Sequence, residues 1–138
     1  MPRSRSSVPE GGHEGGCLCG KVRFRVNLPL IDSGYCHCRM CQRNSGAPAV
    51  AWVSVGTAGF SWLSKDPCIY KSSAHAMREF CDKCGSYIAF RSNERTEVIS
   101  INTSCFDEPE RFPPRKHIFV DSRISWFQTV DDLPRYQD

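Results

Sequence analysis

Two short stretches of the sequence decide how this chain folds, Gly16-Cys-Leu-Cys-Gly20 and Phe80-Cys-Asp-Lys-Cys-Gly85. Each brings two cysteines together on a turn and then places a glycine, the residue that adopts a positive φ without steric cost. Two such turns supply the four thiolates that close a tetrahedral zinc shell, which leaves no position for a substrate. We therefore expect a structural zinc site. Its four ligands are Cys17, Cys19, Cys81 and Cys84.

The two turns are distant in the chain. Cys19 and Cys81 are separated by 62 positions (81 − 19). An ion shared between them would tie the N-terminal region to the middle of the chain and close a long loop. The expected site therefore holds the fold together.

A second cluster, Cys36-His-Cys-Arg-Met-Cys41, places three thiols within six residues. One turn of chain can aim all three at one ion, and three protein ligands leave the fourth position open, as in catalytic zinc sites. An external thiol that takes this position is held as a thiolate. We expect Cys36, Cys38 and Cys41 to form a catalytic zinc site, so that the chain binds two zinc ions. Two alternatives remain: His37 as a fourth ligand, or a metal site without chemistry.

Composition supports a metal protein over a disulfide scaffold. The chain has 138 residues and nine cysteines, an odd number that full internal pairing cannot use. The first sixteen residues, MPRSRSSVPEGGHEGG, contain no apolar segment, so we expect no secretory signal and a cytoplasmic, reducing location. No stretch is apolar enough to span a membrane. The remaining Cys68 and Cys105 are expected to be buried free thiols.

The rest of the chain predicts one mainly β domain. Apolar and polar residues alternate over 21–26 and 97–102, and further short β-prone runs occur at 47–55, 68–71, 74–80 and 87–90. We expect short apolar segments at 118–120 and 124–127 and one or two helical turns, near 40–44 or 107–110. Residues 1–14 are expected to form a flexible tail and residues 15–138 a single zinc-binding domain. Six aromatic residues are assigned to the core: Phe24, Trp52, Phe60, Trp62, Phe90 and Trp126.

The charge is mild, with a formal net charge of +3 and scattered basic residues. This pattern disfavours a strong contact with the phosphates of a nucleic acid. Basic side chains next to the cysteines are expected either to compensate the negative charge of bound thiolates or to bind a substrate. They are Lys21, Arg23, Arg39, Arg43 and Lys83.

At these motifs the chain resembles the glutathione-dependent formaldehyde-activating enzyme family, which includes centromere protein V. The resemblance covers residues 12–136 and rests on the three cysteine motifs in order, followed by Pro114-Arg-Lys-His117, Trp126-Phe127 and Leu133-Pro134. It implies an Mss4-like fold of small stacked antiparallel sheets. It also implies structural zinc at the four-cysteine site and catalytic zinc at the three-cysteine site. Ser86-Tyr87 departs from the family's frequent Thr-Pro, and Cys105 replaces a small residue without a thiol.

The resemblance implies a carbon–sulfur lyase that acts on the adduct of glutathione, or another small thiol, with an aldehyde, as in S-hydroxymethylglutathione. Glutathione would then be a cosubstrate. From their positions, Arg39 and Arg43 are candidates to bind its carboxylates and His37 to move a proton. The alternatives are a non-catalytic zinc module that binds protein or nucleic acid, and a redox protein that uses the three cysteines as dithiols. The sequence does not fix the oligomeric state.

Overall fold

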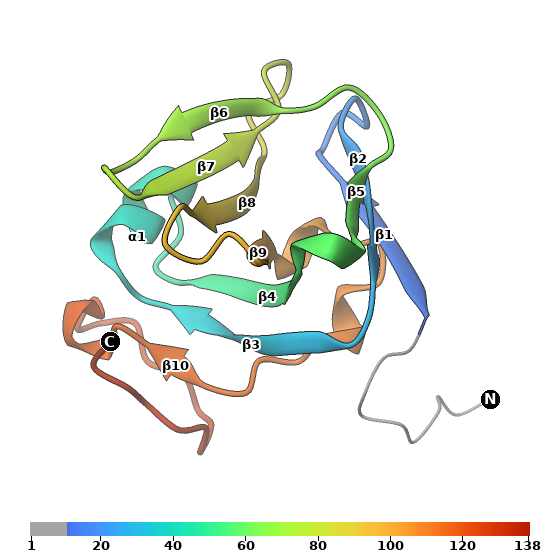
Figure 1. The fold of residues 1–138 in the computed structure, drawn as a ribbon. Helices are drawn as coiled ribbons and strands as arrows, with labels where there is room; N and C mark the ends of the chain where they lie inside the picture. The colour runs from blue at the N-terminus through green and yellow to red at the C-terminus, as the bar shows by residue number, and fades with distance from the viewer. Residues whose placement is uncertain (1–10) are drawn as a thin grey trace.

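The computed structural model describes residues 11–138, and β-strands dominate this part of the chain (Figure 1). The strands are β1 (Gly12–Gly16), β2 (Arg23–Asn27), β3 (Leu30–Cys36), β4 (Val50–Gly56), β5 (Phe60–Trp62), β6 (Cys68–Lys71), β7 (Ala76–Phe80), β8 (Tyr87–Ser92), β9 (Val98–Asn102) and β10 (His117–Ile118). The α-helix is α1 (Arg39–Ser45), and the short 3-10 helices are η1 (Thr57–Gly59), η2 (Thr103–Cys105), η3 (Pro109–Arg111) and η4 (Val120–Ser122). The expected mainly β fold is confirmed.

The strands build two sheets. Strands β1, β2 and β5 form a three-stranded sheet, and the other seven form a sheet in the order β10-β3-β4-β9-β8-β7-β6. Neighbouring strands are antiparallel except β10, which runs parallel to β3. Figure 1 shows the small sheet beside one end of the large one, with α1 at the other end.

The core lies between the two sheets. Phe24 and Val26 of β2 belong to one buried cluster with Val53 of β4 and with Ile99 and Ile101 of β9, and all five side chains have no exposed surface. The alternation predicted over 21–26 and 97–102 supplies these inward-facing residues. Fully burying a side chain of this size contributes about 1.5–3 kcal/mol.

The large sheet also uses its second face. On β4, Val53 and Val55 point into the core, whereas Val50, Trp52 and Ser54 line a pocket on the opposite side. This follows from the two-residue period of a strand, which sends successive side chains to opposite faces. The functional site described below lies on this second face.

A β-bulge in β8 changes which side chains reach the pocket. Its register against β7 shifts between the pairs Glu79↔Ala89 and Phe80↔Tyr87, so Ile88 is an extra residue. Ile88 and Ala89 are both fully buried in the core. Tyr87 and Phe90, three positions apart, therefore both line the pocket.

Several boundaries differ from the sequence-based expectations. Residues 12–14, assigned above to the tail, lie in β1, while residues 1–10 are outside the described part. The strand β3 was missed because Leu30–Cys36 has no alternation of apolar and polar residues. Gly34 is needed there, since a Cβ would lie 2.8 Å from the Lys116 carbonyl oxygen.

The aromatic core was predicted only in part. Phe24 is fully buried, and Phe60 and Trp62 pack against the core, as expected. Trp126 is 73% exposed, and Trp52 and Phe90 face the pocket. Which face of a strand is the core face depends on the partner sheet and on the bulge, and neither is visible in local sequence.

Candidate metal centres and active-site pocket

The four cysteines of the two glycine-ended turns meet at one point. The sulfurs of Cys17, Cys19, Cys81 and Cys84 all lie within 4.8 Å of one another. The Sγ atom of Cys19 is 3.6 Å from that of Cys17 and 3.8 Å from that of Cys81. These distances are too long for a disulfide, but a tetrahedron with Zn–S bonds of about 2.3 Å places its sulfurs about 3.8 Å apart.

The two turns have the same hydrogen-bonding plan. In the first, the Cys17 amide donates to the Val22 carbonyl and the Gly20 amide donates to the Cys17 carbonyl. In the second, the Cys81 amide donates to the Ser86 carbonyl and the Gly85 amide to the Cys81 carbonyl. Gly20 and Gly85 have φ of 83° and 80°, the left-handed region that favours glycine.

Backbone amides also reach the sulfurs of this cluster. The Val22 amide donates to the Cys17 sulfur and the Lys83 amide to the Cys81 sulfur, both at 3.3 Å. Hydrogen bonds from the hydroxyl and amide of Ser86 lower the pKa of Cys84 to about 5. Donors placed in this way stabilise thiolates, the form in which cysteine binds a metal.

The three remaining motif cysteines form a second cluster. The sulfurs of Cys36, Cys38 and Cys41 lie within 4.8 Å of one another. Cys36 ends β3, Cys38 is the N-cap of α1, and Cys41 lies in the first turn of that helix. The Cys41 amide donates to the Cys38 sulfur at 3.3 Å. The strand end and the helix start thus fold three adjacent side chains onto one point.

The close packing of these three sulfurs shifts their pKa values. Hydrogen bonds from Cys36 and Cys41 hold the pKa of Cys38 well below its ordinary value. The hydrogen bond that Cys36 donates to Cys38 raises the pKa of Cys36. Three thiols this close release protons one at a time, because each new negative charge opposes the next. A divalent cation removes that opposition, so the donor set fits a soft metal ion such as zinc.

Arg78 is the cation next to the three sulfurs, and the sequence analysis missed it. Its Nη1 lies 3.6 Å from the Cys41 sulfur and donates to the Tyr87 hydroxyl oxygen at 2.8 Å. Its guanidinium lies 5.5 Å from the centre of the Tyr87 ring and 5.2 Å from that of Phe90. Arg78 is only 3% exposed. The sequence signal that could have indicated this role is a lone arginine within the predicted β-prone run 74–80.

The expected charge compensation by neighbouring basic residues takes a different form. Lys21 pairs with Asp82 at 2.7 Å, a bridge between the two glycine-ended turns. Arg23 pairs with Asp107 at 2.6 Å. Carboxylates neutralise these exposed side chains, and within residues 11–138 the cation that reaches a cysteine sulfur directly is Arg78.

A pocket of about 570 Å³ opens beside the three sulfurs. The second face of the large sheet forms it, together with α1 and the segment after β10. Its lining is mainly apolar. The residues are Cys36, Cys38, Arg39, Met40, Cys41, Val50, Trp52, Ser54, Ser73, Ala76, Arg78, Tyr87, Phe90, Ser100, Asn102, Ile118 and Phe119.

The two arginines assigned to glutathione have different places. Arg39 lines the pocket, and its Nη1 donates to the Gln42 side chain at 2.5 Å. Arg43 lies one helical turn further along α1, is exposed, and does not belong to the pocket lining. Both guanidinium groups remain candidates for substrate contacts.

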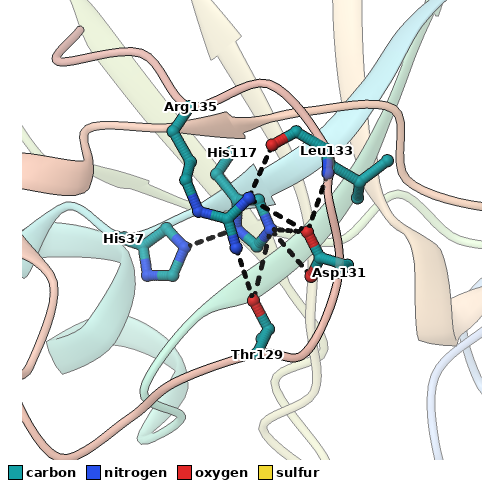
Figure 2. A network of polar contacts seen from close by, with 6 residues as sticks. All are labelled: His37, His117, Thr129, Asp131, Leu133 and Arg135. Atoms are coloured by element: carbon teal, nitrogen blue, oxygen red, sulfur yellow. Dashed lines mark hydrogen bonds and ion pairs between the residues drawn. The ribbon is translucent and has the colours of Figure 1, made fainter.

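The side chain of His37 points into a buried polar network (Figure 2). Its Nε2 lies 2.9 Å from Nδ1 of His117, whose Nε2 lies 3.1 Å from the Asp131 carboxylate. Arg135 donates to Asp131 at 3.1 Å. Both histidines are 1% exposed, and burial lowers the pKa of His37. Since His37 is not part of the three-sulfur cluster, it does not occupy the fourth position.

This network fixes the loop that carries the second cluster. An ionised carboxylate can only accept hydrogen bonds, so His117 Nε2 carries a hydrogen and donates it to Asp131. His117 Nδ1 then accepts a hydrogen bond from His37 Nε2. The Gln42 side chain donates to the His37 carbonyl at 2.8 Å. The segment from Thr129 to Arg135 thus holds His37, the residue between two of the three cysteines.

The isolated cysteines take no part in either cluster. Cys68 and Cys105 are half-buried and unpaired by disulfides. The Cys105 thiol donates to the Tyr87 carbonyl at 3.5 Å, and burial raises its pKa to about 11. Both family departures noted above therefore lie together: Tyr87 in the pocket and Cys105 behind it.

A sequence model of the glutathione-dependent formaldehyde-activating enzyme family matches residues 12–122. The chain belongs to this family. The match includes all seven clustered cysteines, while the similarity expected from residue 123 onward lies outside it.

Two curated relatives agree with this assignment. A Halomonas elongata protein named "Putative glutathione-dependent formaldehyde-activating enzyme" is 27% identical over 124 residues, covering 83% of this chain and 79% of its own. An uncharacterised lyase of Schizosaccharomyces pombe is 25% identical over 116 residues, covering 84% of this chain and 82% of its own. The names support a lyase-type activity at low identity.

The fold also occurs in a solved structure. The crystal structure of a Rhodobacter sphaeroides protein aligns with a TM-score of 0.56 and 19% identity, covering 88% of this chain and 98% of that one. Across residues 11–138 there is no helix long and apolar enough to cross a membrane.

Proposed function

We propose that this protein is a zinc-dependent carbon–sulfur lyase acting on the adduct between glutathione, or another small thiol, and an aldehyde, such as S-hydroxymethylglutathione. The observation that carries the proposal is the position of three cysteine sulfurs and a buried arginine at the wall of a pocket. The cysteines of the four-cysteine cluster do not line this pocket, and the cluster is proposed to be structural. The proposed complement is two zinc ions per chain.

The two cysteine clusters differ in the number of metal coordination positions that they leave open. Four thiolates complete a tetrahedron, whereas three leave one position open to the pocket. When bound there, zinc supplies a site that holds the substrate sulfur and lowers its pKa. Cys36, Cys38 and Cys41 are the proposed ligands.

Arg78 balances charge at this site. Three thiolates and one divalent ion have a net charge of −1, which the guanidinium offsets at 3.6 Å from the Cys41 sulfur. Its contacts with the rings of Tyr87 and Phe90 hold it in place. The positive charge of Arg78 thereby reduces the electrostatic repulsion that a further thiolate would meet at this site.

Tyr87 is the proposed proton donor. Its hydroxyl oxygen accepts from Arg78, so its own hydrogen is available to the pocket. Burial raises the pKa of Tyr87, which keeps the phenol protonated. In the synthetic direction the substrate sulfur bonds to the aldehyde carbon, the C=O π electrons move to oxygen, and that oxygen takes a proton. The proton lost by the thiol balances the reaction.

Arg39 and Arg43 are proposed to bind the carboxylates of glutathione. Arg39 lies at the pocket wall and Arg43 one turn along the same helix. Both are accessible from the side of α1 where a peptide would extend into solvent.

The test replaces zinc with cobalt, whose visible absorption reports its ligands. We expect glutathione to change the spectrum and S-methylglutathione, which has no thiol to ionise, to change it little. Binding should release a proton, because a thiol enters the site as a thiolate. A spectrum unchanged at millimolar glutathione would contradict the proposal and favour a non-catalytic zinc module.

A further inference from the structure

The pocket is much larger than a one-carbon substrate requires. Its volume of about 570 Å³ lies within the range of about 300–1,000 Å³ that suits ligands of drug size. Formaldehyde contributes only two heavy atoms to an adduct. Either the thiol or the aldehyde half must therefore account for the remaining space.

Several polar groups of the lining are bonded to other protein groups, whereas Trp52 Nε1 and Arg78 Nε are buried without a hydrogen-bond partner among residues 11–138. The hydroxyls of Ser54 and Ser100 bond to each other at 2.7 Å. The Asn102 amide donates to the Tyr87 carbonyl at 2.8 Å, and the Ser73 hydroxyl accepts from the His75 amide. Glutathione has two carboxylates, an ammonium group and two amides, and burying such groups without partners costs several kcal/mol. Its peptide portion fits the exposed side near Arg39 better than the interior.

Apolar side chains surround the rest of the space. Trp52 on β4 and Phe90 on β8 lie on the same face of the sheet, with β9 between those strands. Val50 pairs with Cys36 across β3 and β4, which places an apolar wall next to the sulfurs. Such a lining favours an apolar ligand group through the water it releases.

Phe119 adds an independent observation. It has φ 56° and ψ 39°, and it is the non-glycine residue with positive φ among residues 11–138. A bulky side chain is rare in this left-handed region and costs free energy there. The chain keeps a phenyl group at a position that glycine would occupy without strain, and this ring lines the pocket while 40% exposed. A role for this ring as an aromatic contact surface at the pocket rim explains why a phenylalanine stands at this strained position.

We infer that the pocket prefers a bulky apolar aldehyde half, aromatic or branched aliphatic, over formaldehyde. This inference rests on the proposed function and specifies its substrate class. The reaction remains an addition without net oxidation: R–SH and R′–CHO give R–S–CH(OH)–R′, with R′ inside the pocket and the proton transferred from sulfur to oxygen.

The first experiment measures binding by calorimetry to the zinc-loaded protein. S-Methylglutathione and S-benzylglutathione share the same peptide and lack a thiol, so their affinity ratio isolates the group on sulfur. We expect the benzyl compound to bind at least tenfold more tightly. Equal affinities, or a preference for the methyl compound, would overturn the inference.

Two variants test whether the benzyl group binds inside the pocket. Phe119→Gly should reduce the benzyl-to-methyl ratio severalfold without loss of thermal stability, because it removes the ring and the backbone strain together. Ala76→Leu should fill the pocket and reduce the ratio as well. The control is Ile69→Ala, which removes an apolar side chain that is 57% exposed on β6 and outside the pocket. A ratio that stays unchanged in both pocket variants would contradict the assignment.

The second experiment follows turnover by magnetisation transfer between aldehyde and adduct protons in the presence of glutathione. We expect exchange with phenylacetaldehyde to be accelerated at least tenfold more than exchange with formaldehyde. Acceleration of formaldehyde exchange alone would overturn the inference and leave the proposed function intact. No acceleration with any aldehyde, together with an unchanged cobalt spectrum, would overturn the proposed function itself.

Discussion

The two cysteine clusters use the same ligand atom in opposite surroundings. The four-cysteine cluster joins two distant turns, and its sulfurs accept hydrogen bonds from backbone amides. The three-cysteine cluster comes from one turn of chain, and a buried side-chain cation lies beside it at the wall of a pocket. A backbone amide donates to a sulfur in both clusters, and the buried guanidinium of Arg78 is the addition at the cluster beside the pocket. We propose that this difference separates stability from chemistry within the chain.

The largest expected effect is on stability, from Cys81→Ser. This side chain has no exposed surface and belongs to the cluster that ties residues 62 positions apart. We expect loss of one zinc per chain and a decrease of several kcal/mol in the free energy of unfolding, because metal binding at such a site is coupled to folding. Metal analysis and urea unfolding measure both. An unchanged melting temperature with full zinc would remove the structural role.

The matched change in the other cluster is Cys38→Ser. Its ligands span six residues, so the loop that they close restrains the unfolded chain less. We expect aldehyde–thiol exchange to fall to background while circular dichroism and the melting temperature show a folded protein. If Cys38→Ser unfolds the chain as severely as Cys81→Ser, the two clusters do not divide stability from chemistry.

A smaller effect is expected from Tyr87→Phe. The ring and its cation–π contact with Arg78 remain, whereas the proposed proton donor and the hydrogen bond from Arg78 to its oxygen are lost. Removal of such a group costs about 10²-fold in rate. The cobalt spectrum with glutathione should stay as in the unmodified protein, since no ligand changes. A full exchange rate in this variant would show that water or another group supplies the proton.

The smallest effect compares one carboxylate near each cluster. Asp131→Asn alters the hydrogen bonds that orient His117 and His37, so the loop between the three cysteines loses part of its support. We expect a severalfold lower exchange rate. Asp82→Asn breaks the exposed pair with Lys21 beside the four-cysteine cluster and should leave the rate unchanged. Equal effects would mean that the histidine network is not specific to the pocket.

Sequence reasoning located both clusters because their information is local. A glycine one position after Cys19 or Cys84 is enough to indicate the turn. The structure gathers the seven sulfurs into one cluster of four and one of three, as the motifs suggested. Arg78 and Tyr87 were missed for a physical reason. They become neighbours only through the pairing of β7 with β8, and their facing depends on the bulge at Ile88.

The histidines show the same limit. His37 was weighed as a ligand or proton carrier from its place beside Cys36, yet adjacent side chains diverge and its partner, His117, lies 80 positions away. Similarly, β3 was missed because the close approach of Lys116 to Gly34, rather than a pattern of hydrophobic residues, defines that strand.

The bulge at Ile88 has a consequence for how such pockets diverge among relatives. A strand normally offers every second residue to one face, but the extra residue gives the pocket both Tyr87 and Phe90. Deleting Ile88 would restore regular pairing and leave the two rings two positions apart, so both would still face the pocket. Inserting one residue opposite Ile88 in β7 would instead give Ile88 a partner and send either Tyr87 or Phe90 to the core side. Substrate preference in this fold can therefore change through insertion of one residue in β7, with every cysteine ligand left in place.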